Sequence, residues 1–203
     1  DSVVAEIKQS GGEAIANGSS VSDKDGVDNM VEQAMDAYGQ IDILINNAGI
    51  LRDKSFSKME IDDFRAVLEV HLVGAAICSK AVWPIMNERQ YGRILLTASV
   101  SGLWGIFGQT NYGSAKLGLI GFMNALKLEG QKNNIRVNTI SPGALTRMTE
   151  GLMGGADAAT KSRLGPEQVA PAAVYLVSGA APTGVVLQVG GGSVRCVQIV
   201  ETL

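Results

Sequence analysis

The sequence predicts an α/β protein in which helices flank a doubly wound, largely parallel sheet. Short apolar runs alternate with segments of helical periodicity along the chain, and parallel neighbouring strands need such crossovers. Links from helix to strand, such as Gly39-Gln40, are short, whereas three long segments all follow strands: Asn47–Met59, Ser99–Asn111 and Ser141–Gly165. These segments should meet at the carboxyl edge of the sheet, where such folds bind ligands.

Five short runs have the length and apolar content of strands: Ala14–Ala16, Ile41–Ile45, Arg93–Thr97, Ile135–Ile140 and Val185–Val189. Gly190-Gly191-Gly192 closes the last of them. Apolar residues at helical spacing predict the intervening helices: the first ten residues, Val27–Tyr38, Ile61–Trp83, Tyr112–Glu129 and Pro166–Val177. Glycines at 11 and 39 suit helix ends, Pro84 ends or kinks the third helix, and Pro166 suits a first helical turn.

The amino-acid composition limits the classes of protein to which this chain can belong. The 203 residues are 46% hydrophobic and 18% charged, so we expect one folded domain over residues 1–203. The formal net charge of −3, without a dense basic cluster, argues against nucleic-acid binding. Cys78 and Cys196 lie far apart without a CxxC spacing, so neither disulfides nor a metal site are predicted. No membrane span or secretory signal is predicted, and we expect a cytoplasmic protein.

Tyr112 and Lys116 stand four residues apart on a predicted helix, which brings the phenol and the ammonium onto one face, about 6 Å apart at Cβ. At an effective dielectric constant of about 20, attraction across about 5 Å is worth roughly two pKa units. Lys116 is therefore predicted to lower the pKa of Tyr112 and make the phenolate accessible as a general base. The alternative is that Tyr112 and Lys116 form an ordinary pair on the surface, without a catalytic role.

Two further features fall at the same edge of the predicted sheet. Ser99 ends a strand thirteen positions before Tyr112, where its hydroxyl can hydrogen-bond a substrate oxygen, although a turn serine is the alternative. The stretch Asn46–Gly49 follows a buried strand, and its small residues permit close approach of a ligand, although it could be only a turn.

In combination, these motifs resemble the short-chain dehydrogenase/reductase family. The matching motifs stand in the family's order and spacing: Asn46-Asn47-Ala48-Gly49, Ser99, Tyr112-x-x-x-Lys116, Ser141-Pro142-Gly143 and Gly190-Gly191-Gly192. The segments GILRDKSF, YGRILLTASVSG and FGQTNYGSAKLGL are most similar to the (3R)-hydroxyacyl-CoA dehydrogenase part of peroxisomal multifunctional enzymes. The likeness covers essentially the whole chain.

This resemblance implies a Rossmann-like fold and a chemical role for each matching residue. Tyr112 would be the acid/base, Lys116 would lower its pKa and bind the nicotinamide ribose, and Ser99 would steady the substrate oxygen. The remaining cofactor contacts would be Asn47, Ala48 and Gly49 on the adenosine side and Pro142, Gly143 and Thr146 on the nicotinamide side. The cofactor would be NAD or NADP, with NAD favoured, and the substrate a small acyl thioester such as a 3-hydroxyacyl-CoA. A homodimer or homotetramer is expected.

The sequence departs from the family pattern in several places. The glycine-rich TGxxxGxG turn and its strand are absent, so we expect the true protein to be longer at this end. His71 stands where the family usually has Asn, and is interpreted as a helix histidine satisfied by one hydrogen bond rather than as a catalytic group. The segment Gly151–Thr160 is rich in small residues and is a candidate substrate lid.

Two other functions stay open. One is a 3-oxoacyl-acyl-carrier-protein reductase that uses NADPH, which differs in carrier and direction. The other is a cofactor-free interaction module or pseudoenzyme, a hypothesis motivated only by the missing glycine-rich turn.

Overall fold

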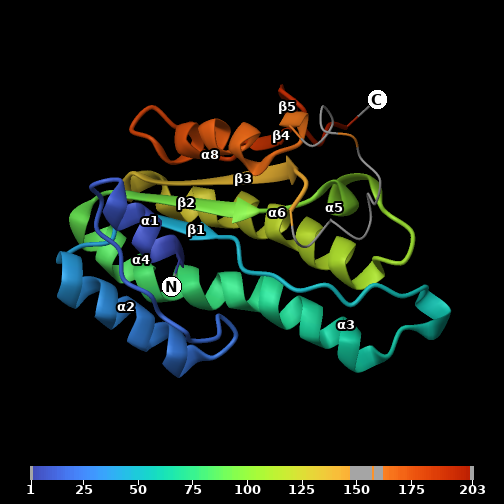
Figure 1. Cartoon of the computed structure of the whole chain (residues 1–203), viewed down its shortest axis with the longest axis horizontal. Helices are drawn as coiled ribbons and strands as arrows, with labels where there is room; N and C mark the ends of the chain where they lie inside the picture. Colours follow the sequence, from blue (N-terminus) through green and yellow to red (C-terminus); the bar gives the residue numbers. More distant parts are fainter. Residues whose placement is uncertain (1, 147–156, 158–161, 202–203) are drawn as a thin grey trace.

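The computed structural model describes residues 2–146, 157 and 162–201. Within them, a five-stranded sheet has the strand order β1-β2-β3-β4-β5 (Figure 1). The strands are β1 (Ile43–Asn46), β2 (Gly92–Thr97), β3 (Ile135–Gly143), β4 (Val186–Gly190) and β5 (Ser193–Val197). The first four pair in parallel and β5 pairs antiparallel with β4. The predicted α/β fold with a largely parallel sheet is confirmed.

The α-helices are α1 (Ser2–Gln9), α2 (Lys24–Tyr38), α3 (Ile61–Leu68), α4 (Gly74–Arg89), α5 (Val100–Trp104), α6 (Thr110–Gly130) and α8 (Ala170–Val177). A π-helical segment, η2 (Glu69–Val73), joins α3 to α4. Short 3-10 turns are η1 (Phe56–Lys58), η3 (Gln131–Asn133) and η4 (Pro166–Gln168). Gly39 ends α2 at a φ of 72°, a backbone conformation that favours glycine.

Helices cover both faces of the sheet, as Figure 1 shows. Successive residues of β2 point to opposite faces: Ile94 and Leu96 pack in the core beneath α4 and α6, whereas Leu95 packs against α8. All six residues of β2 are buried, which agrees with its mostly apolar sequence, in which Arg93 and Thr97 are the polar members.

Two predictions about strands are wrong. Ala14–Ala16 forms no strand; Asn17 next to it donates instead to the side chain of Gln33 on α2, at 2.7 Å. Three residues without a neighbouring strand to pair with cannot form a ladder. Conversely, β5 was not predicted, because its burial pattern is mostly exposed and its position depends on pairing with β4 across the glycine turn.

The predicted third helix continues through Pro84 to Arg89, so Pro84 does not end it. The helical stretch Ile61–Arg89 is long and apolar enough to cross a membrane by length and composition, and 39% of its most apolar window is buried. It packs beside the sheet, with Val82 and Met86 in the main core (Figure 1). The core helix of a folded domain has this same composition, so the absence of a membrane span stays a prediction. The candidate lid Gly151–Thr160 lies outside the described residues except for Asp157.

Candidate active site

A pocket of about 990 Å³ opens at the carboxyl ends of β1, β2 and β3. Eight of the predicted site residues line it: Asn47, Gly49, Ser99, Tyr112, Lys116, Pro142, Gly143 and Thr146. Ala48 is not part of the lining. Described residues of all three long segments thus meet at one edge of the sheet, as the segment lengths indicated.

Ser99 and Tyr112 come together although they stand thirteen positions apart in the sequence. Ser99 caps the amino terminus of α5, where its Oγ accepts a hydrogen bond from the Ser101 N–H at 3.2 Å. Tyr112 lies in the first turn of α6, and hydrogen bonding by the Ser99 side chain acts to lower the pKa of its phenol. The cap fixes the serine hydroxyl on a rigid element, so both hydroxyl groups can face the same substrate oxygen.

Lys116 follows Tyr112 by one helical turn and is 3% exposed. Its Nζ lies 5.4 Å from the centroid of the Tyr112 ring and donates to the backbone carbonyl of Thr97 at the end of β2. Burial lowers the pKa of Lys116 to about 8. An ammonium carries three donors, and among the described residues only the Thr97 carbonyl is recorded as accepting one.

The predicted direction of the Tyr112 pKa is wrong for this structure. The pKa of Tyr112 is raised above its usual value, chiefly because burial disfavours the phenolate. The hydrogen bond with Ser99 lowers it, and the negative charge of Asp53 raises it further. A simple pairwise attraction to Lys116 omitted the cost of removing the phenol from water, which is larger.

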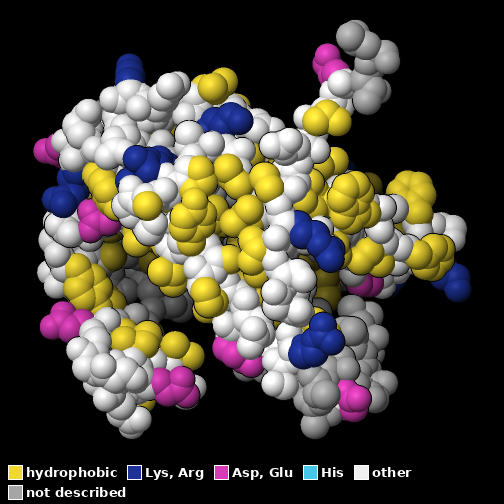
Figure 2. All heavy atoms as spheres, turned by 90° about the horizontal axis from the view of Figure 1, so that it is seen from above, with side chains coloured by type: hydrophobic (Ala, Val, Ile, Leu, Met, Phe, Trp, Pro, Cys, Tyr) yellow, Lys and Arg dark blue, Asp and Glu magenta, His cyan; other side chains and the backbone are white. Residues whose placement is uncertain are grey.

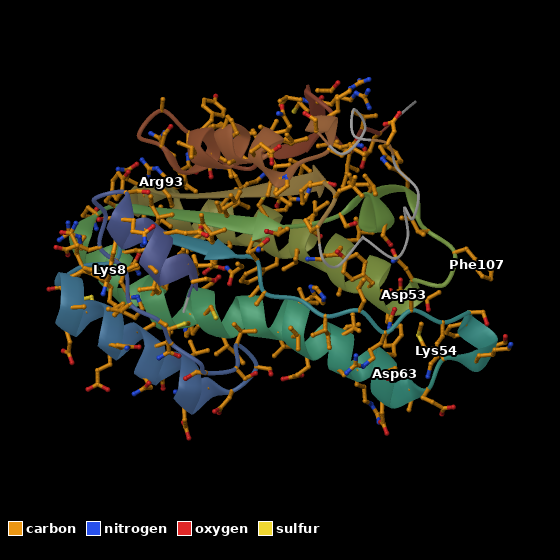
Figure 3. The ribbon with its side chains drawn as sticks, viewed as in Figure 1. Lys8, Asp53, Lys54, Asp63, Arg93 and Phe107 are labelled. Atoms are coloured by element: carbon orange, nitrogen blue, oxygen red, sulfur yellow. The ribbon has the colours of Figure 1, made fainter. Side chains whose placement is uncertain are left out.

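The loop after β1 forms one wall of the site and is bonded to the start of α6. Asp53 accepts a hydrogen bond from Gln109 at 2.6 Å, and the Arg52 carbonyl accepts one from Asn111 at 3.0 Å. Lys54 lies beside Asp63 of α3 (Figure 3), and the two form an ion pair of 2.9 Å. Sequence reasoning missed Asp53, Gln109 and Asn111, because their partners lie more than fifty residues away and no local pattern marks them.

His71 is 3% exposed and also lines the pocket. Its Nε2 lies 2.8 Å from the carbonyl oxygen and 3.0 Å from the nitrogen of Ile50, so the expected backbone hydrogen bond is present. Its Nδ1 is buried and has no hydrogen-bond partner among the described residues. Burial, followed by the nearby charge of Lys116, lowers the pKa of His71 to about 4, so the ring is neutral at physiological pH.

Gly49 is required by the close approach of this ring. A Cβ added at Gly49 would lie 2.2 Å from Cε1 of His71. We therefore expect Gly49→Ala to reduce the free energy of unfolding by about 1–3 kcal/mol, since either the ring or the loop must move. Urea denaturation would measure this loss.

Gly18→Ala is the matched control, because a Cβ there meets nothing within 4 Å and the backbone does not adopt a positive φ. Equal stability losses in the two variants would contradict the steric explanation for Gly49.

The residues of the pocket fit a nicotinamide nucleotide. The two donors of Lys116 without recorded acceptors suit the hydroxyl groups of a ribose. Asn47, whose Oδ1 accepts from Thr97 Oγ1 at 3.1 Å, lines the same pocket as Lys116, together with Gly49 and Gly143. Among the described residues, no group of three His, Cys, Asp or Glu side chains is arranged to hold a metal ion.

Comparisons with known proteins identify the class. Residues 1–154 match the family model for short chain dehydrogenases. The chain belongs to the short-chain dehydrogenase family, whose members are oxidoreductases that use NAD or NADP.

Individual relatives indicate particular enzymes within this family to which the chain is similar. The chain is 46% identical to a short-chain type dehydrogenase/reductase of Mycobacterium tuberculosis, over 98% of this chain and 69% of that one. It is 45% identical to peroxisomal multifunctional enzyme type 2 of Mus musculus, over 95% of this chain but only 25% of that enzyme. The structure of full-length peroxisomal multifunctional enzyme type 2 from Drosophila melanogaster superposes with a TM-score of 0.82 and 36% identity, covering 98% of this chain and 34% of that one. The predicted resemblance to this branch is confirmed.

Proposed function

We propose that this chain interconverts the secondary alcohol and the ketone of a 3-hydroxyacyl thioester carried on coenzyme A, with NAD as cofactor. The observation that carries this proposal is the placing of Ser99, Tyr112 and Lys116 on one wall of the 990 Å³ pocket. The similarity to the peroxisomal multifunctional enzymes of Mus musculus and Dictyostelium discoideum supports the substrate class. Family membership supports a nicotinamide cofactor, either NAD or NADP, and the choice of NAD is part of the proposal.

The chain's own groups supply the proton chemistry. In the direction of ketone reduction, the Tyr112 phenol donates its proton to the substrate oxygen while the Ser99 hydroxyl hydrogen-bonds the same oxygen; in alcohol oxidation the proton returns to Tyr112. Lys116, anchored to the Thr97 carbonyl, orients the ribose and keeps a positive charge near the phenol. The nicotinamide, when bound, supplies or accepts the hydride.

A 3-oxoacyl-acyl-carrier-protein reductase is the second candidate. The relative of that name in Synechocystis is 39% identical over 96% of this chain and 81% of its own length. The two functions differ in the group that carries the acyl chain and in the nucleotide. We expect turnover of 3-hydroxybutyryl-CoA with NAD to exceed reduction of acetoacetyl-acyl-carrier protein with NADPH by at least about tenfold in kcat/KM, which is about 1.4 kcal/mol of transition-state discrimination.

Initial rates with both carriers and both nucleotides would measure this preference. The reverse preference would replace the first candidate with the second. Calorimetric titration with NADH and NADPH would detect a cofactor-free module, which binds neither.

We further propose a homo-oligomer in the cytoplasm. Support for assembly comes from exposed apolar side chains, among them Leu117 and Leu128 of α6, which are 47% and 68% exposed. Figure 2 shows hydrophobic side chains on the face that carries α8, where Val174 is 65% exposed. Sedimentation of the purified protein would measure the number of subunits.

A further inference from the structure

A second, smaller pocket of about 210 Å³ adjoins the candidate active site. Gly143 and Leu164 line both pockets, so the two cavities share a wall at the carboxyl end of β3. The other described residues of the smaller pocket belong to the β4–β5 hairpin, and three of them carry polar side chains: Gln188, Ser193 and Arg195. The proton chemistry proposed above uses none of these three side chains.

The hairpin places the three polar side chains on one face. Gln188 lies opposite Arg195 in the antiparallel ladder. Gly190 lies opposite Ser193, so residues 191 and 192 alone form the turn, and their φ angles of 59° and 77° are typical of a type I′ hairpin. Paired residues, and residues two positions apart, project from the same face of a ladder. Gln188, Ser193 and Arg195 therefore lie together beside the shared wall.

Arg195 gives the smaller pocket its charge. It is the one charged side chain in the described lining of that pocket, as Lys116 is in the larger one. Within the part of the chain that the structure describes, Arg195 forms no ion pair. In contrast, Arg93 and Arg136 donate to backbone carbonyls and hold the fold together. The Arg195 guanidinium is thus available to an external anion, and this group binds phosphate with two parallel donors.

The two pockets suit the two ends of an acyl thioester. Leu51, Val100 and Ile106 give the larger pocket an apolar wall, which suits an acyl chain. The polar and charged lining of the smaller pocket suits the polar carrier to which the chain is attached.

The distance across the sheet agrees with the length of that carrier. β5 lies three strands from β2, at whose carboxyl end Ser99 stands, and it forms the opposite edge of the sheet from β1 (Figure 1). At about 4.8 Å for each strand, the separation is about 14 Å. The pantetheine arm, from the thioester sulfur to its phosphate, is about as long as four extended residues, roughly 14 Å. A thioester whose reacting oxygen lies at Ser99 can therefore reach Arg195 with its phosphate.

We propose that Arg195, together with Ser193 and Gln188, binds the phosphate at the end of the pantetheine arm of a substrate carried on coenzyme A. The guanidinium supplies the positive charge, and the hydroxyl and amide groups supply further donors. The inference rests on the proposed function, because that function places the reacting oxygen at Ser99. The affinity of the hairpin for the phosphate is measurable without turnover.

A truncated substrate isolates this contact. The pantetheine thioester of 3-hydroxybutyrate has the reacting group and the arm of 3-hydroxybutyryl-CoA but lacks the phosphate. We expect wild-type kcat/KM to be at least about tenfold higher for the coenzyme A thioester, mainly through KM, because the contact is made equally in the ground state and the transition state. Arg195→Met should lower this ratio at least about fivefold and leave kcat/KM for the pantetheine thioester within about twofold of wild type.

Two further variants separate the specific contact from general effects. Arg195→Lys keeps the charge without the paired donors, so it should recover part of the lost ratio. Arg65→Met is the matched control, because Arg65 is an exposed arginine on α3 that pairs with Asp62 and lies outside the described lining of both pockets. The ratio should be unchanged in Arg65→Met.

Calorimetric titration tests the site without any reaction. We expect the Kd of free coenzyme A to rise at least about fivefold in Arg195→Met and the Kd of NADH to change less than about twofold. Raising the salt concentration should weaken the binding of coenzyme A more in the wild type than in this variant, since the attraction between opposite charges is screened. If Arg195→Met does not fold, Arg195→Gln is measured in its place with the same expectations.

Four results would overturn the assignment. They are an unchanged ratio in Arg195→Met, an equal fall in Arg65→Met, a loss of NADH affinity in place of coenzyme A affinity, and a loss confined to acyl-carrier-protein thioesters. If the wild type turns over none of the thioesters, the proposed function is wrong. In that case the titration with coenzyme A still decides whether Arg195 binds the phosphate.

Discussion

Replacing Tyr112 with Phe is expected to lower turnover about 10³-fold while the affinity for the nicotinamide nucleotide changes less than about threefold. The substitution removes the one oxygen that donates the proton in the proposed mechanism, and leaves the ring that packs against His71. Lys116 keeps its bond to the Thr97 carbonyl, so the predicted ribose site is retained. Initial rates with a 3-hydroxyacyl-CoA and calorimetric titration with NADH would measure the two quantities.

Tyr175→Phe is a matched control, because this tyrosine lies on α8, is 49% exposed and is outside the pocket lining. Turnover within a few-fold of wild type in Tyr112→Phe would eliminate the proposed mechanism.

Lys116→Met is expected to lower turnover about 10²- to 10³-fold and, at the same time, to stabilise the protein by about 1–3 kcal/mol at pH 7. Activity is expected to fall because, in the proposed mechanism, the ribose and the phenol lose their cationic neighbour. Stability rises because the folded protein no longer holds a buried ammonium, whose desolvation lowers the pKa of Lys116 to about 8 from the usual 10.5. The gain is limited by loss of the bond to the Thr97 carbonyl.

The stability gain expected for Lys116→Met decreases as the pH rises above about 8. Below pH 8 both folded and unfolded chains carry the proton on Lys116, so the cost of burying the charge is present in full. Between about pH 8 and 10.5 the unfolded chain binds more protons than the folded one, and the stability of the wild type rises relative to that of the variant. The advantage of Lys116→Met should therefore be constant below pH 8 and shrink above it.

Urea denaturation at pH 7, 8, 9 and 10 would follow the difference between the two proteins. Lys58→Met controls for the loss of a surface charge, because Lys58 is an exposed lysine in the 3-10 turn η1. A variant that is less stable than the wild type at pH 7 would show that the hydrogen bond to Thr97 outweighs the desolvation of the ammonium.

Most of the fold could be predicted because it depends on local patterns. The apolar strand at 93–97 and the helical periodicity before Gly39 are local signals, and each matches an element of the structure. The errors in strand prediction concern contacts between distant segments. Ala14–Ala16 lacks a strand to pair with, and β5 depends on pairing with β4. Strand pairing is decided by contacts between distant segments, so a short run considered alone is ambiguous.

The sequence by itself determined which groups stand at the site, since Ser99 follows one strand and Tyr112 and Lys116 share one face of a helix. Only the tertiary structure decided the electrostatic state of those groups: burial raises the pKa of Tyr112 and lowers that of Lys116, and Asp53 arrives from a distant loop. The hydrogen bond between the His71 ring and the backbone of Ile50 was likewise decided by the tertiary structure. The spacing of residues along an element follows from covalent geometry, whereas desolvation and through-space charge depend on everything that packs around a group.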